Sequence, residues 1–157
     1  METKSYEALL LEAKVKAANY CAYQERTQQQ VRDKLYSLGL YQSDVEEILT
    51  SLIIDNFVNE ERFARTFSAG KFRIKKWGKL KIKFHLERLN LSDYCIKKGL
   101  EEIDDAEYLE TLNALIARKL GSISDENIYL LNKKIAGNLI HKGFEPELVW
   151  TTLKDRM

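Results

Sequence analysis

The sequence predicts an all-α protein in which three tandem three-helix repeats form an elongated, curved array. One proline and seven glycines in 157 residues leave few chain breaks, which favours long helices over a many-turned β-sandwich. Three windows also align without gaps at offsets of 51 and 53 residues, and such a period has room for three helices. We therefore expect repeat units at 1–57, 58–105 and 106–157.

The aligned windows each contain a helix, a turn, an apolar residue, a short polar stretch and a second helix. Their apolar pairs are Val31 with Leu35, Ile82 with Leu86, and Ile135 with Leu139. The turn position is held in order by Gly39, Asn90 and Gly143. Glycine and asparagine tolerate the left-handed conformation that commonly follows a helix C-terminus, so we expect a helix to end at each.

Other signals place the remaining helices in order. Apolar residues at helical spacing predict a helix over about 5–24, and a second over about 108–120 that ends at Gly121. A loop at 122–124 then precedes a helix over about 125–142. Asn59 is expected to cap a helix whose apolar side carries Phe63, Phe67 and Ile74. The second helices of the three windows have their own start signals: a capping box at Ser43–Glu46, an N-cap at Ser92, and Pro146.

The segment 79–84 alternates lysine with apolar residues, which is typical of a strand. We interpret it as helix because Ile82 and Leu86 keep the register of the other two windows and no hairpin partner is present. Leu80 and Phe84 would then form a second apolar face. Such a helix would suit a middle unit wedged between two neighbours.

Charge is distributed unevenly along the chain, although the net charge is only +1. Residues 71–98 carry ten basic and two acidic side chains, whereas the segments on either side have an excess of acid. Seven cations and no acid lie between Lys71 and Lys83. A solvated helix face usually mixes signs, so a cluster of one sign favours a polyanion or an acidic protein surface as partner.

The sequence lacks the motifs of common enzymes and metal sites. It contains no Walker A loop, GxGxxG, GxSxG or HExxH, and no zinc-type spacing of cysteine and histidine. Cys21, His85 and His141 are interpreted as packing or surface residues. The apolar runs are too short for a membrane span, and the first residues do not resemble a secretory signal. We expect a cytoplasmic protein with reduced thiols, no cofactor and no catalytic residues.

The segment Phe57-Val-Asn-Glu-Glu-Arg-Phe-Ala-Arg-Thr-Phe67 is followed by Lys71, Lys76-Trp-Gly-Lys79, Ile82 and Leu86. In order and spacing these residues resemble the core of the RecX regulators of the bacterial recombinase RecA. The resemblance covers roughly residues 15–153 and is strongest over 53–89. It implies tandem three-helix units and no cofactor. It also implies binding to RecA filaments on DNA, with restraint of ATP hydrolysis, strand exchange and coprotease activity in recombination, repair and the SOS response.

This resemblance and the charge pattern together give a candidate surface for DNA or the RecA filament. Its expected members are Lys71, Arg73, Lys75, Lys76, Lys79, Lys81, Lys83 and Arg88. Further expected partner contacts are Arg62, Arg65, Lys97 and Lys98. Trp77 could stack on a base, but its place beside Gly78 at a helix junction favours packing between helices. The acidic outer units would contact basic protein surfaces, and the protein is expected to be a monomer that binds DNA only weakly alone.

Two other classes remain open. The segment 80–100 has helix-turn-helix spacing, so the chain could be a general DNA-binding protein. Against this, no set of Arg, Asn and Gln residues presents a readable code for bases. A helical adaptor that binds another protein and no nucleic acid is the third class.

Overall fold

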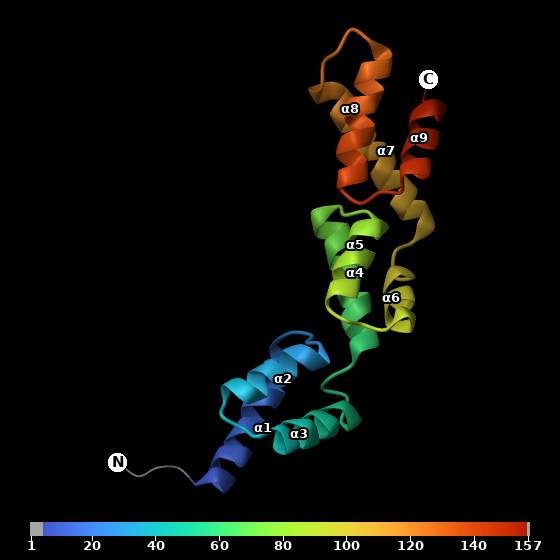
Figure 1. The fold of residues 1–157 in the computed structure, drawn as a ribbon. Helices are drawn as coiled ribbons and strands as arrows, with labels where there is room; N and C mark the ends of the chain where they lie inside the picture. Colours follow the sequence, from blue (N-terminus) through green and yellow to red (C-terminus); the bar gives the residue numbers. More distant parts are fainter. Residues whose placement is uncertain (1–4, 157) are drawn as a thin grey trace. The chain divides into compact units, whose positions relative to one another are not determined.

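The computed structural model describes residues 5–156, and over this range the chain forms nine α-helices and no strand (Figure 1). The predicted all-α class, with three-helix domains in tandem, is confirmed. The expected unit ranges include residues 1–4 and 157, which lie outside the described residues. The helices are α1 (Tyr6–Tyr23), α2 (Gln28–Ser37), α3 (Gln42–Ile54), α4 (Glu60–Lys75), α5 (Lys79–Arg88), α6 (Asp93–Leu100), α7 (Asp105–Ser122), α8 (Ile128–His141) and α9 (Pro146–Asp155).

The chain divides into two compact units, one up to Phe63 and one from Ala64 onward. In the first unit, α1, α2 and α3 enclose a core that includes Val31, Leu35 and Val45, none of which is exposed. Thr27 begins α2 with a capping box, in which its hydroxyl accepts from the Gln30 amide. This reciprocal cap stabilises the helix start by satisfying backbone N–H groups that otherwise have no partner.

The capping box expected at Ser43 is wrong. Helix α3 begins at Gln42, and its N-cap residue is Tyr41, which makes no side-chain cap. The Tyr41 ring lies 5.1 Å from the Tyr6 ring, and its amide donates to the Tyr6 hydroxyl. These contacts with α1 place Tyr41 at the helix start, so Ser43 already lies inside the first turn, where its hydroxyl cannot cap.

The second unit contains α5 to α9 and most of α4. Ile82 and Leu86 of α5 and Ile135 and Leu139 of α8 have no exposed surface, as the repeat register predicts. The turn prediction is also confirmed, because the backbone φ angles are positive at Gly39 (92°), Asn90 (61°) and Gly143 (106°). The helical interpretation of 79–84 is correct, since α5 spans this segment.

Several expected details are wrong. Ile74, Leu80 and Phe84 are exposed by 80%, 46% and 55%, so α5 has one buried apolar face and α4 does not bury its last isoleucine. Ile74 lies in the last turn of α4, next to cations that remain in solvent. Helix α7 continues through Gly121 to Ser122, and α8 begins three residues later than expected, after the N-cap Asn127.

The turn between α8 and α9 packs directly on the start of α5. The Gly78 amide donates to the Lys142 carbonyl and the Leu80 amide donates to the Gly143 carbonyl, both at 3.0 Å. A Cβ atom placed on Gly78 would lie 2.1 Å from the Gly143 carbonyl carbon. The backbones therefore touch at a position that only glycine allows, and this junction joins the helices around α5 to those around α8 and α9.

Tyr108 of α7 strengthens the same junction. Its hydroxyl accepts from the Lys79 amide at 3.0 Å and donates to the Glu145 carboxylate. Its ring stacks on Phe144 at 5.1 Å and also contacts Phe72 at 5.7 Å. The first amides of α5 are thus satisfied by groups from α7 and from the turn after α8. Within residues 5–156, no helix is long and apolar enough to cross a membrane.

Candidate anion-binding surface

The expected basic surface lies along the end of α4, the linker after it, and α5. Acidic residues begin α4 and basic residues end it, an order that complements the helix macrodipole. Lys76 ends the helix with φ 58°, and the chain then turns through Trp77 into α5. The exposed members of the predicted set are Arg73, Lys75, Lys76, Lys83 and Arg88, and the partly buried members are Lys71, Lys79 and Lys81.

Trp77 lies at the centre of this surface and packs between α4 and α5, as expected. The ammonium of Lys71 is 5.0 Å from the indole centroid and that of Lys81 is 4.5 Å from it. The His85 ring lies 4.7 Å away, and the Phe67 ring makes an edge contact at 6.5 Å. Cation–π contacts of this kind hold an ammonium over an aromatic ring. The tryptophan thereby brings together one lysine from α4 and one from α5.

The pKa of His85 is affected by burial and by the positive charges around the ring. Its pKa is lowered from the ordinary histidine value, first because burial disfavours the charged form, and then because Lys81, Arg88 and Lys71 repel a further cation. Three cations around the imidazole thus disfavour its protonation.

Lys79 differs from the other members of the set. Its ammonium lies 3.0 Å from the Asp105 carboxylate and 4.6 Å from the centroid of the Tyr108 ring. It also borders an open cleft of about 610 Å³, with Lys83 and Lys97 beside it. Apolar and acidic side chains line the cleft together with the lysines: Asp93, Ile96, Leu100, Glu101, Ile103 and Asp105. Lys79 is thus partly neutralised, whereas no ion pair between the described residues 5–156 includes Lys71, Lys76 or Lys81.

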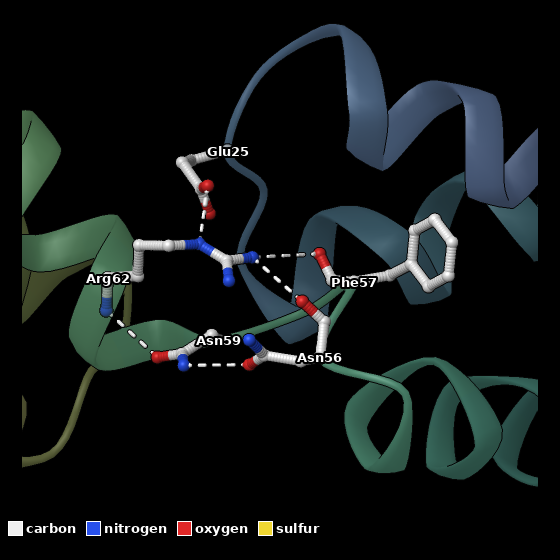
Figure 2. A network of polar contacts seen from close by, with 5 residues as sticks. All are labelled: Glu25, Asn56, Phe57, Asn59 and Arg62. Atoms are coloured by element: carbon white, nitrogen blue, oxygen red, sulfur yellow. Dashed lines mark hydrogen bonds and ion pairs between the residues drawn. The ribbon is translucent and has the colours of Figure 1, made fainter.

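The structure places three of the four additional candidates in intramolecular ion pairs. Arg62 donates from Nε to Glu25 at 2.6 Å and from its terminal nitrogen to the Asn56 carbonyl at 3.0 Å (Figure 2). Its own amide donates to Asn59, which confirms Asn59 as the cap of α4. Arg65 pairs with Glu102 at 3.0 Å, and Lys98 lies 3.5 Å from Glu101. These three cations have structural partners, and Lys97 is exposed on α6.

Lys142, which the sequence reasoning missed, also borders this surface through its carbonyl, and Arg118 and Lys119 lie close enough to act on its charge. The pKa of Lys142 is lowered, first by burial and then by the charges of Lys119, Arg118, Lys81 and Lys76. Lys142 lies in the turn that packs on α5, and Arg118 and Lys119 lie near the end of α7. The charge count of their segment gave no sign of these three basic residues, because residues 99–157 carry more acidic than basic side chains. No linear pattern could reveal a cluster that depends on the contact between two turns.

The described residues 5–156 include no group of three or more His, Cys, Asp or Glu side chains that could hold a metal ion. The surface described above instead carries ammonium and guanidinium groups, among them Arg73, Lys76 and Lys83. Such groups bind phosphates or carboxylates through charge and hydrogen bonds.

The fold defines a class of proteins built from tandem three-helix domains with a basic central domain. Family models for the first, second and third three-helix domains of RecX match residues 13–52, 59–100 and 105–153. The matched segments follow one another in the family order and cover most of the chain. The chain belongs to the RecX family of regulatory proteins.

Individual relatives agree with this assignment. The chain is 24% identical over 150 residues to "Regulatory protein RecX" of Bacillus cereus (strain B4264), which covers 96% of this chain and 56% of that protein. It is 26% identical over 140 residues to the protein of the same name from Prosthecochloris aestuarii, covering 89% and 90%. The chain thus spans little more than half the length of the Bacillus relative.

Solved structures share the fold. The crystal structure of RecX from Lactobacillus salivarius superposes with a TM-score of 0.86 at 24% sequence identity, and the match covers 94% of this chain and 96% of that one. A second structure, titled "Crystal structure of regulatory protein RecX", gives a TM-score of 0.82 at 20% identity, covering 95% and 73%.

Proposed function

We propose that this protein inhibits the RecA recombinase by binding the RecA–DNA filament in the cytoplasm, as a monomer, and restraining its ATPase, strand-exchange and coprotease activities. The observation that carries the proposal is the presence of all three RecX domains in order. The relatives named above are called regulatory proteins, and RecA regulation comes to this chain from that family.

The basic surface supplies the means of binding. Lys71, Lys76 and Lys81 gather around Trp77 and the α8–α9 turn, and Arg73, Lys75, Lys83 and Arg88 are spread over the same segment of chain. Lys79 contributes less, because Asp105 already pairs with it. The target would be DNA phosphate within the filament or acidic patches on RecA subunits. The protein would act by binding alone, without a catalytic residue or cofactor.

Binding at more than one point would explain the restraint. Residues up to 70 carry eight basic and eleven acidic side chains, so the first domain would contact a basic protein surface while the second meets the polyanion. A chain attached to neighbouring filament subunits in this way would resist the movements that strand exchange requires.

The test is the ATPase rate of a bacterial RecA on single-stranded DNA, titrated with the wild-type protein. We expect inhibition at fewer than one molecule per RecA subunit. The variant with Lys76→Glu, Lys81→Glu and Lys83→Glu should lose inhibition while its helical circular dichroism spectrum is unchanged. The matched control reverses three exposed lysines elsewhere, with Lys14→Glu, Lys133→Glu and Lys154→Glu, and should inhibit normally. No inhibition by the wild type would contradict the proposed function, and full inhibition by the first variant would contradict the proposed surface.

A gel shift on single-stranded DNA, with and without RecA, separates the two other classes. A general DNA-binding protein would shift the DNA equally well without RecA. An adaptor that binds a protein other than RecA, and no nucleic acid, would shift neither naked DNA nor DNA coated with RecA.

A further inference from the structure

Helix α4 buries one side in the second unit and presents the opposite side to solvent. Three residues spaced four apart are buried, namely Ala64, Ser68 and Phe72. The residues two positions later lie about 200° further around the helix, on the opposite side. They are Thr66, Gly70 and Ile74. Ile74 is 80% exposed, so this side of the helix offers apolar surface to a partner.

An open hollow of about 240 Å³ lies along this side of the helix. Its lining residues are Thr66, Phe67, Gly70, Lys71, Ile74 and Lys75, and we call it the α4 hollow. Sites for small molecules usually measure about 300–1,000 Å³. A hollow of this size therefore suits one side chain of a partner better than a whole ligand. The lining combines apolar and basic side chains, and none of these six residues is acidic.

Gly70 leaves room for a partner in the α4 hollow. A Cβ atom on this glycine would meet nothing within 4 Å, and its φ angle is not positive. Neither the packing of the described residues nor the backbone conformation therefore requires glycine here. Glycine inside a helix is less stable than alanine, and one reason to place it there is the close approach of another molecule. We interpret Gly70 in this way.

The side chains around the α4 hollow indicate what the partner carries. The Lys71 ammonium lies 5.4 Å from the centroid of the Phe67 ring, and the Lys75 side chain is exposed. These cations favour carboxylates or phosphates. A strand bound through its phosphates would leave Ile74 in water, whereas protein interfaces insert an apolar anchor into a pocket within a polar rim. A protein segment with an apolar side chain beside carboxylates matches both features.

We propose that the α4 hollow receives an apolar side chain from an acidic surface segment of a RecA subunit, and that Lys71 and Lys75 pair with carboxylates of the same segment. The inference rests on the proposed function, because RecA is the partner named there. It adds to that function a docking site on the exposed side of α4 whose occupant is protein and not nucleic acid.

The test fills the hollow without changing charge. Gly70→Leu places a side chain in it, and Ile74→Gln removes apolar surface from its lining. The matched control is Gly137→Leu, at an exposed glycine of α8 whose Cβ would also meet nothing within 4 Å. Binding is measured by co-sedimentation with filaments that RecA forms on single-stranded DNA with a slowly hydrolysed ATP analogue. We expect Gly70→Leu and Ile74→Gln to bind about tenfold more weakly, the usual loss when one apolar anchor is no longer buried. The control should bind within about threefold of the wild type.

Two further measurements decide between occupants. Fluorescence anisotropy with a labelled oligodeoxythymidylate, without RecA, should give the wild type and Gly70→Leu the same affinity. An equal loss on naked DNA and on filaments would show that nucleic acid occupies the hollow, and would overturn the proposal. Urea unfolding should show Gly70→Leu to be at least as stable as the wild type. A loss of stability that Gly137→Leu does not share would show that another part of the chain covers the hollow, which would also overturn it.

The two proposals fail in distinguishable ways. If the wild type inhibits the RecA ATPase and Gly70→Leu binds filaments equally well, the docking inference is overturned and the proposed function stands. If filament binding depends on the hollow but the wild type does not inhibit the ATPase, the proposed function is overturned and the docking inference stands. A wild type that does not bind filaments at all would overturn both.

Discussion

The Gly78 amide donates a hydrogen bond to the Lys142 carbonyl at 3.0 Å, across 64 residues of sequence. This bond and its neighbour from Leu80 to Gly143 place the α8–α9 turn on the first turn of α5. The amides at a helix start are a common site for anions. Here the amides at the start of α5 donate to other groups of the protein. We therefore attribute the proposed anion binding of this region to the side chains that the junction brings together.

The contact between Gly78 and Gly143 is expected to be essential to the second unit. In Gly78→Ala the new methyl group would lie 2.1 Å from the Gly143 carbonyl carbon, and both sides of the contact are backbone. We expect the free energy of unfolding to fall by about 1–3 kcal/mol, the usual range for overpacking. The measurement is urea unfolding followed by circular dichroism.

A helical glycine in open space provides the control for that substitution. A Cβ atom on Gly137, in the middle of α8, would meet nothing within 4 Å. Gly137→Ala should therefore stabilise the protein by about 0.5–1 kcal/mol through helix propensity. Equal effects of the two substitutions would show that the junction is not tightly packed.

The two sides of α5 should respond differently to substitution. Leu80→Gln on the exposed side should change the free energy of unfolding by less than about 0.5 kcal/mol. Ile82→Ala on the side with no exposed surface should cost about 2–5 kcal/mol, because it leaves a cavity. A large loss from the Leu80 variant would mean that this face is covered in the folded protein.

Tyr108 should make stability depend on alkaline pH. Burial raises its pKa well above the ordinary tyrosine value of 10.0, and the hydrogen bond to Glu145 raises it further. Above about pH 10 the unfolded chain releases this proton while the folded protein keeps it, so the stabilisation is complete below pH 10 and declines above it. We expect Tyr108→Phe to cost about 2 kcal/mol at pH 7, by leaving the Lys79 amide and Glu145 without their partner.

The pH dependence of that difference is the decisive readout. The advantage of the wild type over Tyr108→Phe, measured by urea unfolding, should shrink between pH 9 and pH 11. A difference that is constant over this range would contradict the proton linkage, while leaving the hydrogen bonds in place.

The pKa of His85 should report on the positive charge around Trp77. We expect its titration midpoint in an NMR experiment to lie below about 6.5, the ordinary value. Lys81→Gln should raise the midpoint by removing a nearby positive charge, and a bound oligonucleotide should raise it further. The variant His141→Gln, used as the background, leaves His85 as the only histidine signal. A midpoint insensitive to both changes would show that the lysines do not face the imidazole.

Much of the fold could be predicted because repeated local patterns specify it. Ile82, Leu86, Ile135 and Leu139 repeat the spacing of Val31 and Leu35, and all six are fully buried. Turn chemistry was equally informative, since the left-handed positions require Gly or Asn. These signals act within one or two helical turns, so a linear pattern is enough to find them.

The features that escaped prediction depend on contacts between distant segments. Nothing near Ser43 in the sequence shows that Tyr6 packs on Tyr41 and moves the helix start. Leu80 and Phe84 have the spacing of a buried face, but both are exposed, and the backbone hydrogen bonds from the α8–α9 turn go to Gly78 and Leu80 at the start of α5. Lys142 joined the candidate site for the same reason, because its neighbours come from three other parts of the chain.

The central claim is that the cations around Trp77 and the junction meet phosphates. The most direct measurement is the affinity for a filament that RecA forms on single-stranded DNA with a slowly hydrolysed ATP analogue, determined over a range of salt concentrations at which the filament is intact. About five phosphate contacts on a single strand predict that log K falls against log salt with a slope of roughly −3.5. A slope near zero would contradict the claim and leave uncharged protein contacts as the basis of binding.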